Sequence, residues 1–175
     1  RGAEVVLVSG PTSLPPPAGV EYCPVTTAEE MRKAMTTRRT WSDTVIMAAA
    51  VADFRPARPS AHKLKKRRGP ITHLELEATD DILHELSTGR TSQVLVGFAA
   101  ETDDLLAHAK EKLHAKGVDL LVANDVTAPG SGFGADTNRV WLLTRDGDPE
   151  ELPLLSKRDV ADRILDRILT LQTSR

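Results

Sequence analysis

Val94-Leu95-Val96-Gly97-Phe98 is the stretch that decides the fold class of this chain. It is short and apolar throughout, which is typical of a strand buried on both faces of a parallel sheet. A helical segment follows it, and residues 118–123 then form a second, mostly apolar run that is also typical of a buried strand. Apolar strands that alternate with amphipathic helices indicate an α/β protein with a parallel sheet.

The alternation continues toward both ends of the chain. We expect further strands at residues 5–8, 44–48, 72–77 and 140–143, the third of them half-polar. The expected helices begin after Thr27, Thr79, Thr102 and Ser156. These elements predict a Rossmann-like, doubly wound, mostly parallel sheet with helices on both faces. Because no repeat or long linker interrupts the pattern, residues 1–175 are expected to form one domain.

Composition excludes several classes of function. The 175 residues include 23 basic and 25 acidic side chains, so binding to nucleic acid over the whole surface is not expected. A single cysteine, Cys23, excludes a disulfide framework and a multi-cysteine zinc site. No apolar run approaches the ~20 residues of a membrane span, and no signal peptide is visible. We therefore expect a cytoplasmic protein without a membrane partner.

Candidate site residues follow the buried strands, because ligands of α/β sheets bind at the carboxyl ends of the strands. Small residues at 48–50 precede Asp53, whose carboxylate could hold a metal-bound phosphate or a ribose, or could simply cap a turn. Phe98 could stack on a base or belong to the core. Asn124 and Asp125 could bind a ligand or cap a turn. Composition alone leaves these alternatives open.

Residues 63–68 form the strongest charge feature, with five basic side chains in six positions. Such a run is usually a solvated face or arm, and it lacks the aromatic residues of a nucleic-acid patch. Alternatively, one of its lysines enters a site where phosphates are neutralised. No phosphate-binding glycine fingerprint is present in the chain.

Six segments, taken in order, resemble bacterial phosphopantothenate–cysteine ligase, commonly the C-terminal half of a bifunctional coenzyme A biosynthesis protein. The segments are Val8-Ser9-Gly10-Pro11-Thr12, Ala49-Ala50-Val51-Ala52-Asp53-Phe54-Arg55, Lys63-Leu64-Lys65-Lys66, Val96-Gly97-Phe98-Ala99-Ala100-Glu101-Thr102, Ala123-Asn124-Asp125 and Ser156-Lys157. The second and the fourth are highly specific, and together the six cover nearly the whole chain.

The resemblance implies a reaction in two steps. The carboxylate of 4'-phosphopantothenate attacks the α-phosphate of CTP, which gives an acyl-cytidylate and pyrophosphate. The amine of L-cysteine then attacks the acyl carbon and releases CMP. Mg²⁺ is the implied cofactor and CTP the co-substrate, and FMN is expected only where a decarboxylase domain is fused.

The resemblance also implies site residues. Lys63 is the implied catalytic residue and Asp53 the implied metal ligand. The nucleotide contacts would be Met47, Ala48, Ala49, Asp53, Lys63, Asp80, Asp81, Ile82, Leu83, Phe98, Lys112 and Lys116. The last two lie late in their expected helix, away from the carboxyl ends of the strands. Family members also carry an earlier strand and a glycine-rich loop before the position of Arg1, so this chain is expected to be an incomplete catalyst by itself.

The family dimerises through extended arms, so the segment around Lys63 and residues 72–77 is expected to cross to a second copy in a homodimer or a higher oligomer. Two other functions compete with the ligase. One is a nicotinamide-dependent oxidoreductase on the same fold, which would need a glycine fingerprint. The other is a nucleic-acid or protein-binding module that uses residues 63–68.

Overall fold

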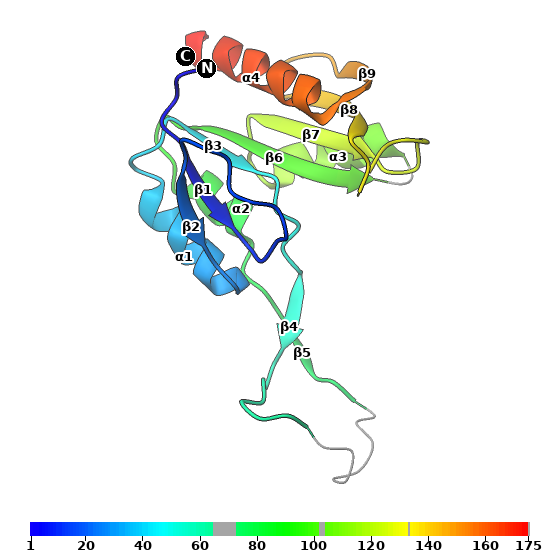
Figure 1. Ribbon diagram of the computed structural model, residues 1–175. Coiled ribbons are helices and arrows are strands. Elements are labelled where there is room, and N and C mark those ends of the chain that lie inside the picture. The colour runs from blue at the N-terminus through cyan, green and yellow to red at the C-terminus, as the bar shows by residue number, and fades with distance from the viewer. Residues whose placement is uncertain (65–72, 102–103, 133, 175) are drawn as a thin grey trace. The chain divides into compact units, whose positions relative to one another are not determined.

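The computed structural model describes residues 1–64, 73–101, 104–132 and 134–174 (Figure 1). Two compact units make up the chain. The first comprises residues 1–34 and 50–81, and the second comprises residues 35–49 and 82–175.

The second unit contains a five-stranded sheet in the order β3-β6-β7-β8-β9. Its strands are β3 (Thr44–Met47), β6 (Val94–Glu101), β7 (Leu120–Asp125), β8 (Thr137–Thr144) and β9 (Glu150–Ser156). The first three run parallel, and β8 and β9 extend the sheet by antiparallel pairing. The expected mostly parallel α/β sheet is confirmed, but β9 was not expected from the sequence.

Helices cover both faces of this sheet, as expected (Figure 1). On one face α4 (Lys157–Thr173) packs Val160, Ile164 and Ile168 against alternate strand residues such as Val96 and Val122. On the other face lie α2 (Ile82–Thr88) and α3 (Leu105–Ala115). The central strands are apolar over residues 94–96 of β6 and 120–123 of β7 because both of their faces are covered there.

Two helix starts follow the local patterns in the sequence. In α1 (Ala28–Arg38), Glu30 N–H donates to Thr27 Oγ1 and Thr27 N–H donates to Glu30 Oε2, both at 3.1 Å. Ser156 caps α4 by accepting from Asp159 N–H at 3.1 Å. In contrast, α3 begins after Asp104 instead of the expected Thr102, which lies outside the described residues.

The first unit contains two small sheets. β1 (Val6–Ser9) pairs in parallel with β2 (Glu21–Pro24), and β4 (Phe54–Pro56) pairs antiparallel with β5 (Leu76–Ala78). The first strand was expected to be fully buried, but it is half-buried, since a two-stranded sheet offers each strand only one neighbour. Neither β2 nor β4 was expected at these bounds. β5 begins at Leu76, within the expected strand 72–77, and residue 72 lies outside the described residues.

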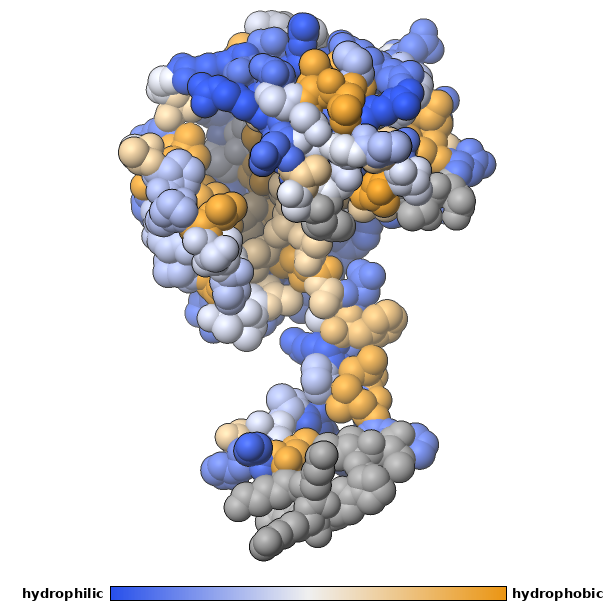
Figure 2. All heavy atoms as spheres, turned by 45° about the vertical axis from the view of Figure 1, so that its right-hand side comes forward, coloured by the Kyte–Doolittle hydropathy of each residue, from blue (hydrophilic) through white to orange (hydrophobic). Residues whose placement is uncertain are grey.

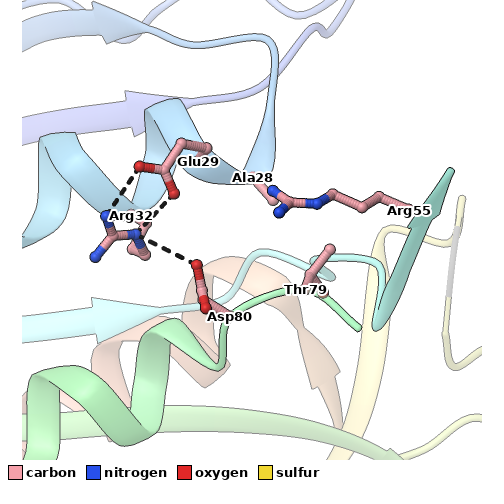
Figure 3. A pocket seen from close by; sticks show the side chains of 6 residues that line it. All are labelled: Ala28, Glu29, Arg32, Arg55, Thr79 and Asp80. Carbon is pink, nitrogen blue, oxygen red and sulfur yellow. Dashed lines mark hydrogen bonds and ion pairs between the residues drawn. The ribbon is translucent and has the colours of Figure 1, made fainter. Parts of the chain in front are cut away.

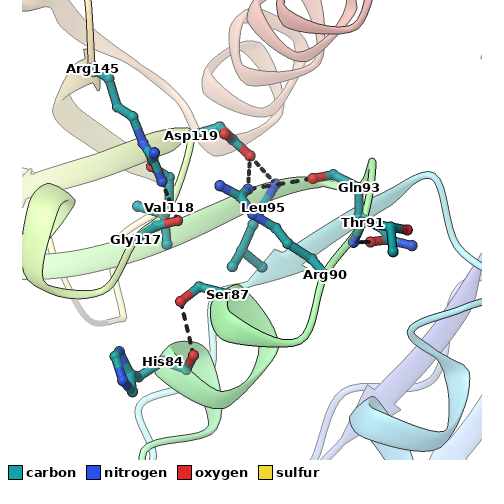
Figure 4. Close-up of polar contacts among 10 residues, drawn as sticks. All are labelled: His84, Ser87, Arg90, Thr91, Gln93, Leu95, Gly117, Val118, Asp119 and Arg145. Carbon is teal, nitrogen blue, oxygen red and sulfur yellow. Dashed lines mark hydrogen bonds and ion pairs between the residues drawn. The ribbon is translucent and has the colours of Figure 1, made fainter. Parts of the chain in front are cut away.

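A polar cluster closes the amino-terminal edge of the five-stranded sheet, and its Arg90 and Asp119 side chains are largely buried (Figure 4). Asp119 forms an ion pair with Arg90 and also accepts from the backbone N–H of Leu95 at 2.8 Å. Arg145 donates to the carbonyl oxygens of Val118 at 3.0 Å and Gly117 at 2.6 Å. These contacts satisfy backbone groups between α3 and β7, so this edge is structural.

Candidate functional site

The carboxyl-terminal edge of the same sheet brings together candidate residues from two strands. Met47 ends β3 and is in register with Gly97 of β6, next to Phe98. Residues 48 and 49 follow β3 and are exposed. Phe98 is half-buried and packs against the core beneath α4, so it belongs to the core and still presents part of its surface. Small exposed residues thus follow one strand at this edge, and a half-buried aromatic side chain lies on the neighbouring strand.

The start of α2 is brought to this edge by a close contact with β6. A Cβ added to Gly97 would lie 2.8 Å from Leu83 Cδ2, so the glycine lets the first turn of α2 approach the strand. Ile82 is buried and Leu83 is half-buried. Both side chains thus serve packing, and only backbone groups of this turn are available to a ligand.

Thr79 is not the cap of α2, contrary to the expectation. Its hydroxyl donates to the carbonyl of Ala52, and its N–H donates to the carbonyl of Asp53 at 2.9 Å. The helix begins three residues later, at Ile82, so Asp80 and Asp81 precede it instead of forming its first turn. The pairing of β4 with β5 accounts for this difference, because it extends to Thr79 and uses the groups that a cap would need.

Asp53 and its neighbours in the first unit carry exposed carboxylates. The Asp53 side chain makes no hydrogen bond or ion pair with a described residue, so it caps no turn there. Asp80 lies on the other side of the Thr79 contact, and its carboxylate is 3.7 Å from Arg32 Nε. The ribbon pairing therefore holds Asp53 and Asp80 near one another, while Arg32 offsets the charge of Asp80.

Arg32 was not identified from the sequence, although it sits three residues after Glu29 on the first turns of α1. Its guanidinium binds both oxygens of Glu29, at 2.8 and 2.9 Å, and reaches Asp80 (Figure 3). The hydrogen bond from Arg32 lowers the pKa of Glu29. Arg32 and Arg55 both line one small hollow in the first unit. The pKa of Arg55 is raised by its hydrogen bond and ion pair with Glu77. These ion pairs offset part of the negative charge of the segment before α2.

The predicted basic residues belong to different elements of the two units. Lys63 is exposed after β4 in the first unit, and residues 65–68 of the basic run lie outside the described residues. Lys112 belongs to the last turn of α3, and Lys116 is its C-cap. Both precede β7, at the amino-terminal edge of the sheet, whereas Phe98 lies toward the opposite edge.

Asp53 is the metal ligand that the resemblance implies. Among the described residues, no three His, Cys, Asp or Glu side chains come together as a metal site. Mg²⁺ is commonly held by one or two carboxylates together with substrate phosphates and water. One unpaired carboxylate fits that arrangement, and a protein-only metal cage does not. Within the described part of the chain, no helix combines the length and apolar character needed to cross a bilayer.

The β4–β5 ribbon presents apolar side chains to solvent (Figure 2). Phe54 is 62% exposed, and Leu64, Leu74 and Leu76 are each more than half exposed. Ion pairs from Arg55 to Glu77 and from Arg58 to Glu75 link the two sides of the ribbon. Phe54 and Leu76 lie in the two strands of the ribbon, and Leu64 and Leu74 lie in the segments that continue from them, so exposed apolar residues recur along this part of the first unit.

Comparison with known proteins identifies the family of this chain. Residues 1–171 match the family model described as DNA/pantothenate metabolism flavoprotein C-terminal domain. The chain belongs to this family. It is 52% identical over 171 residues to the Coenzyme A biosynthesis bifunctional protein CoaBC of Bacillus subtilis (strain 168), covering 97% of this chain and 42% of that protein.

Two further relatives match almost the whole chain. A cysteine/cysteine sulfinic acid decarboxylase from an unknown prokaryotic organism is 40% identical over 97% of this chain and 48% of its own length. The crystal structure of the C-terminal domain of a CoaBC protein superposes with a TM-score of 0.82 and 42% identity, covering 99% of this chain and 79% of that one. The chain thus spans less than half the length of the Bacillus subtilis protein and of the decarboxylase. Its fold is that of the CoaBC C-terminal domain.

Proposed function

We propose that this chain is the phosphopantothenate–cysteine ligase part of a coenzyme A biosynthesis enzyme and that it uses CTP. The observation that carries the proposal is the 52% identity to CoaBC over 97% of the chain. Candidate nucleotide residues at the carboxyl-terminal edge of the sheet, the usual place for a ligand in an α/β fold, support it. The decarboxylase relative shares the same domain over 48% of its length, so its name favours no separate activity for this chain.

In the proposed first step, the phosphopantothenate carboxylate attacks the α-phosphate of CTP and pyrophosphate leaves. Met47, Ala48 and Ala49 line the nucleotide, Phe98 lies beside the base, and backbone groups from Asp80 to Leu83 read the pyrimidine edge. Lys63 neutralises charge that develops on the phosphates. Asp53 is the residue that would hold Mg²⁺, which supplies further positive charge to the phosphates when bound. In the second step, the cysteine amine displaces CMP from the acyl carbon.

Lys112 and Lys116 stand apart in this proposal. The resemblance assigns both to the nucleotide, but they lie at the sheet edge opposite to Phe98. Substituting each with Gln tests the assignment directly. A loss of CTP affinity would retain them as nucleotide contacts, and unchanged affinity would remove them from the site.

We also propose a homodimer formed through the β4–β5 ribbon. Its exposed Phe54, Leu64, Leu74 and Leu76 would lose contact with water on association, which is the usual driving force for such an interface. Replacing Leu74 and Leu76 by Ser is expected to lower the molar mass measured by light scattering. A mass that does not change would contradict the ribbon interface.

The decisive experiment measures pyrophosphate release from CTP plus 4'-phosphopantothenate in the full protein, with ATP in a parallel reaction. We expect release with CTP and much less with ATP. Lys63→Gln should lower the rate by on the order of 10²–10³, the usual cost of losing one transition-state contact. Lys66→Gln, in the same basic run, is the matched control and should have a small effect. Comparable small losses of rate in both variants would indicate that residues 63–68 form a solvated arm without a catalytic lysine.

A further inference from the structure

A cavity of about 440 Å³ lies on the last two strands of the five-stranded sheet, within the second unit. Its lining residues are Arg139 of β8 and Glu151, Pro153 and Leu154 of β9. The volume is in the usual range of small-molecule sites, roughly 300–1,000 Å³. These residues are not among the nucleotide contacts described above, so the proposed function leaves the cavity without an assigned ligand.

The charged side chains of the cavity are only partly used within the fold. Arg139 Nε donates to Glu151 Oε1 at 2.8 Å, and Nη2 of the same guanidinium contacts the same oxygen. Within the residues that the structure describes, no hydrogen bond uses Arg139 Nη1 or Glu151 Oε2. The two side chains are 45% and 36% exposed. A cationic donor and an anionic acceptor thus stand side by side, and each can still bind a ligand.

Asp125 adds a second negative charge beside this pair. Its Oδ1 atom accepts from Thr127 and Ala128, and no hydrogen bond to a described residue uses Oδ2. The hydrogen bond with Glu151 raises the pKa of Arg139, and the charge of Asp125 raises it further. One positive and two negative side chains leave a net negative charge. This charge disfavours a phosphate or a simple carboxylate and favours a ligand that carries an ammonium group.

The other wall of the cavity is apolar. Leu154 is 48% exposed and lies beside the loop between β7 and β8, since a Cβ added to Gly130 would be 3.5 Å from Leu154 Cδ2. Together with Pro153 it can cover a short apolar group or a thiol, which behaves as a small hydrophobe. A guanidinium, a carboxylate and an apolar wall match the three parts of a small α-amino acid, namely its carboxylate, its ammonium group and its side chain.

The cavity lies toward the edge of the sheet where ligands of α/β folds bind. β8 runs antiparallel to β7, so Arg139 near its start lies toward the carboxyl ends of the parallel strands, as does Leu154 near the end of β9. β8 is two strands away from β6, about 10 Å at the usual strand spacing. A ligand in the cavity would therefore lie beside a nucleotide held at β3 and β6 and would not take its place.

We propose that this cavity binds the L-cysteine substrate, with Arg139 on its carboxylate, Glu151 on its ammonium group and the apolar wall against its side chain. The inference rests on the proposed function, because that function supplies the amino acid as the second nucleophile. It gives the Arg139–Glu151 pair a role in substrate recognition in addition to its link between β8 and β9.

Ligation kinetics of the full protein with two amines, at saturating CTP and 4'-phosphopantothenate, test the proposal. Cysteamine is L-cysteine without the carboxylate that Arg139 would bind. Arg139→Gln should therefore raise the KM for L-cysteine roughly 10-fold or more without raising the KM for cysteamine. Glu151→Gln should raise both KM values, since both amines carry the ammonium group. Arg163→Gln, on the exposed side of α4, is the matched control and should keep both values within about 2-fold of wild type.

The two amines separate recognition from a merely structural role. Equal increases of KM for both amines in Arg139→Gln overturn the proposal, as does a wild-type KM for L-cysteine. Circular dichroism checks that the variants are folded, and if Arg139→Gln is not, unchanged KM values in Glu151→Gln overturn it.

Pyrophosphate release without any amine reports on the first step alone. A loss of this release as large as the loss of ligation in Arg139→Gln would also overturn the proposal, because the cavity would then act before cysteine binds. A wild-type protein that releases no pyrophosphate from CTP overturns the proposed function itself, and this is seen before any variant is measured.

Discussion

Asp119 lies just before β7 at the amino-terminal edge of the five-stranded sheet, and Asn124 lies within β7 at the carboxyl-terminal edge. Asp119 accepts from both Arg90 and Leu95, and its side chain is only 11% exposed. Asn124 accepts from Asn138 and keeps a donor that no described residue uses. Saturated polar groups stabilise the fold, whereas an oriented but unused group is available for binding. The two edges thus differ in how fully their polar side chains are used within the fold.

Asp119→Ala should have the largest effect on stability. It leaves the Arg90 guanidinium and the Leu95 N–H without their acceptor in a buried place, which typically costs about 3 kcal/mol. Urea denaturation measures this loss. The CTP affinity of the folded fraction should not change, because the substitution lies at the edge that we regard as structural.

The matched control is Glu151→Ala, which breaks an exposed ion pair with Arg139 in the same sheet. Exposed pairs contribute less than about 1 kcal/mol, so this variant should unfold close to wild type. Equal losses in the two variants would contradict the view that burial makes the amino-terminal edge important.

Phe98→Leu should show the opposite behaviour. A leucine keeps most of the packing beneath α4, so the free energy of unfolding should change by less than about 1.5 kcal/mol. Loss of the aromatic face should weaken CTP binding roughly 10-fold, the usual scale for stacking on a base. Calorimetry and urea denaturation on the same samples separate the two effects. Unchanged affinity would make Phe98 a core residue only.

Gly97→Ala tests how closely α2 must approach β6. The added methyl group would lie 2.8 Å from Leu83 Cδ2 and 3.3 Å from Leu121 Cδ1, and these flexible ends can partly move away. We expect a loss of about 1 kcal/mol in stability, together with a smaller loss of CTP affinity than Phe98→Leu causes. A stability loss with fully retained affinity would show that the first turn of α2 does not contact the nucleotide.

The smallest effect should come from the loop that follows β7. Asp125 accepts from the hydroxyl and N–H of Thr127 and from Ala128 N–H, and these bonds lower its pKa. Its stabilisation is therefore fully present above the unfolded value of about 3.9 and is lost as the pH falls through the lower folded value. Because the carboxylate is half-exposed, we expect it to contribute less than about 1 kcal/mol to the free energy of unfolding. Asp125→Asn should flatten the pH dependence of urea unfolding below about pH 4, and an unaltered profile would assign that dependence to other carboxylates.

The sequence was sufficient wherever the physical cause is local or uniform along an element. The strands around Val96 and Val122 are apolar at successive positions because helices cover both faces of the sheet. A strand of this kind can be predicted without knowing its neighbours or its register in the sheet. The caps at Thr27 and Ser156 depend on contacts within three residues. The family could likewise be identified from short strings such as residues 96–102, since each string is continuous in the chain.

Tertiary structure decided what depends on partners far along the chain. The sequence around Thr79 is typical of a helix cap. Its hydrogen-bond partners are instead the carbonyls of Ala52, 27 residues earlier in the chain, and of Asp53. β9 carries a single buried residue, Leu152, and is a strand because β8 offers it an edge. The orientation of the Asn124 amide depends on Ser131 and Asn138, which only the pairing of β7 with β8 and the intervening loop bring together. A residue type shows which hydrogen bonds a side chain is able to make, but the register of distant strands determines which of them are already made and which are left for a ligand.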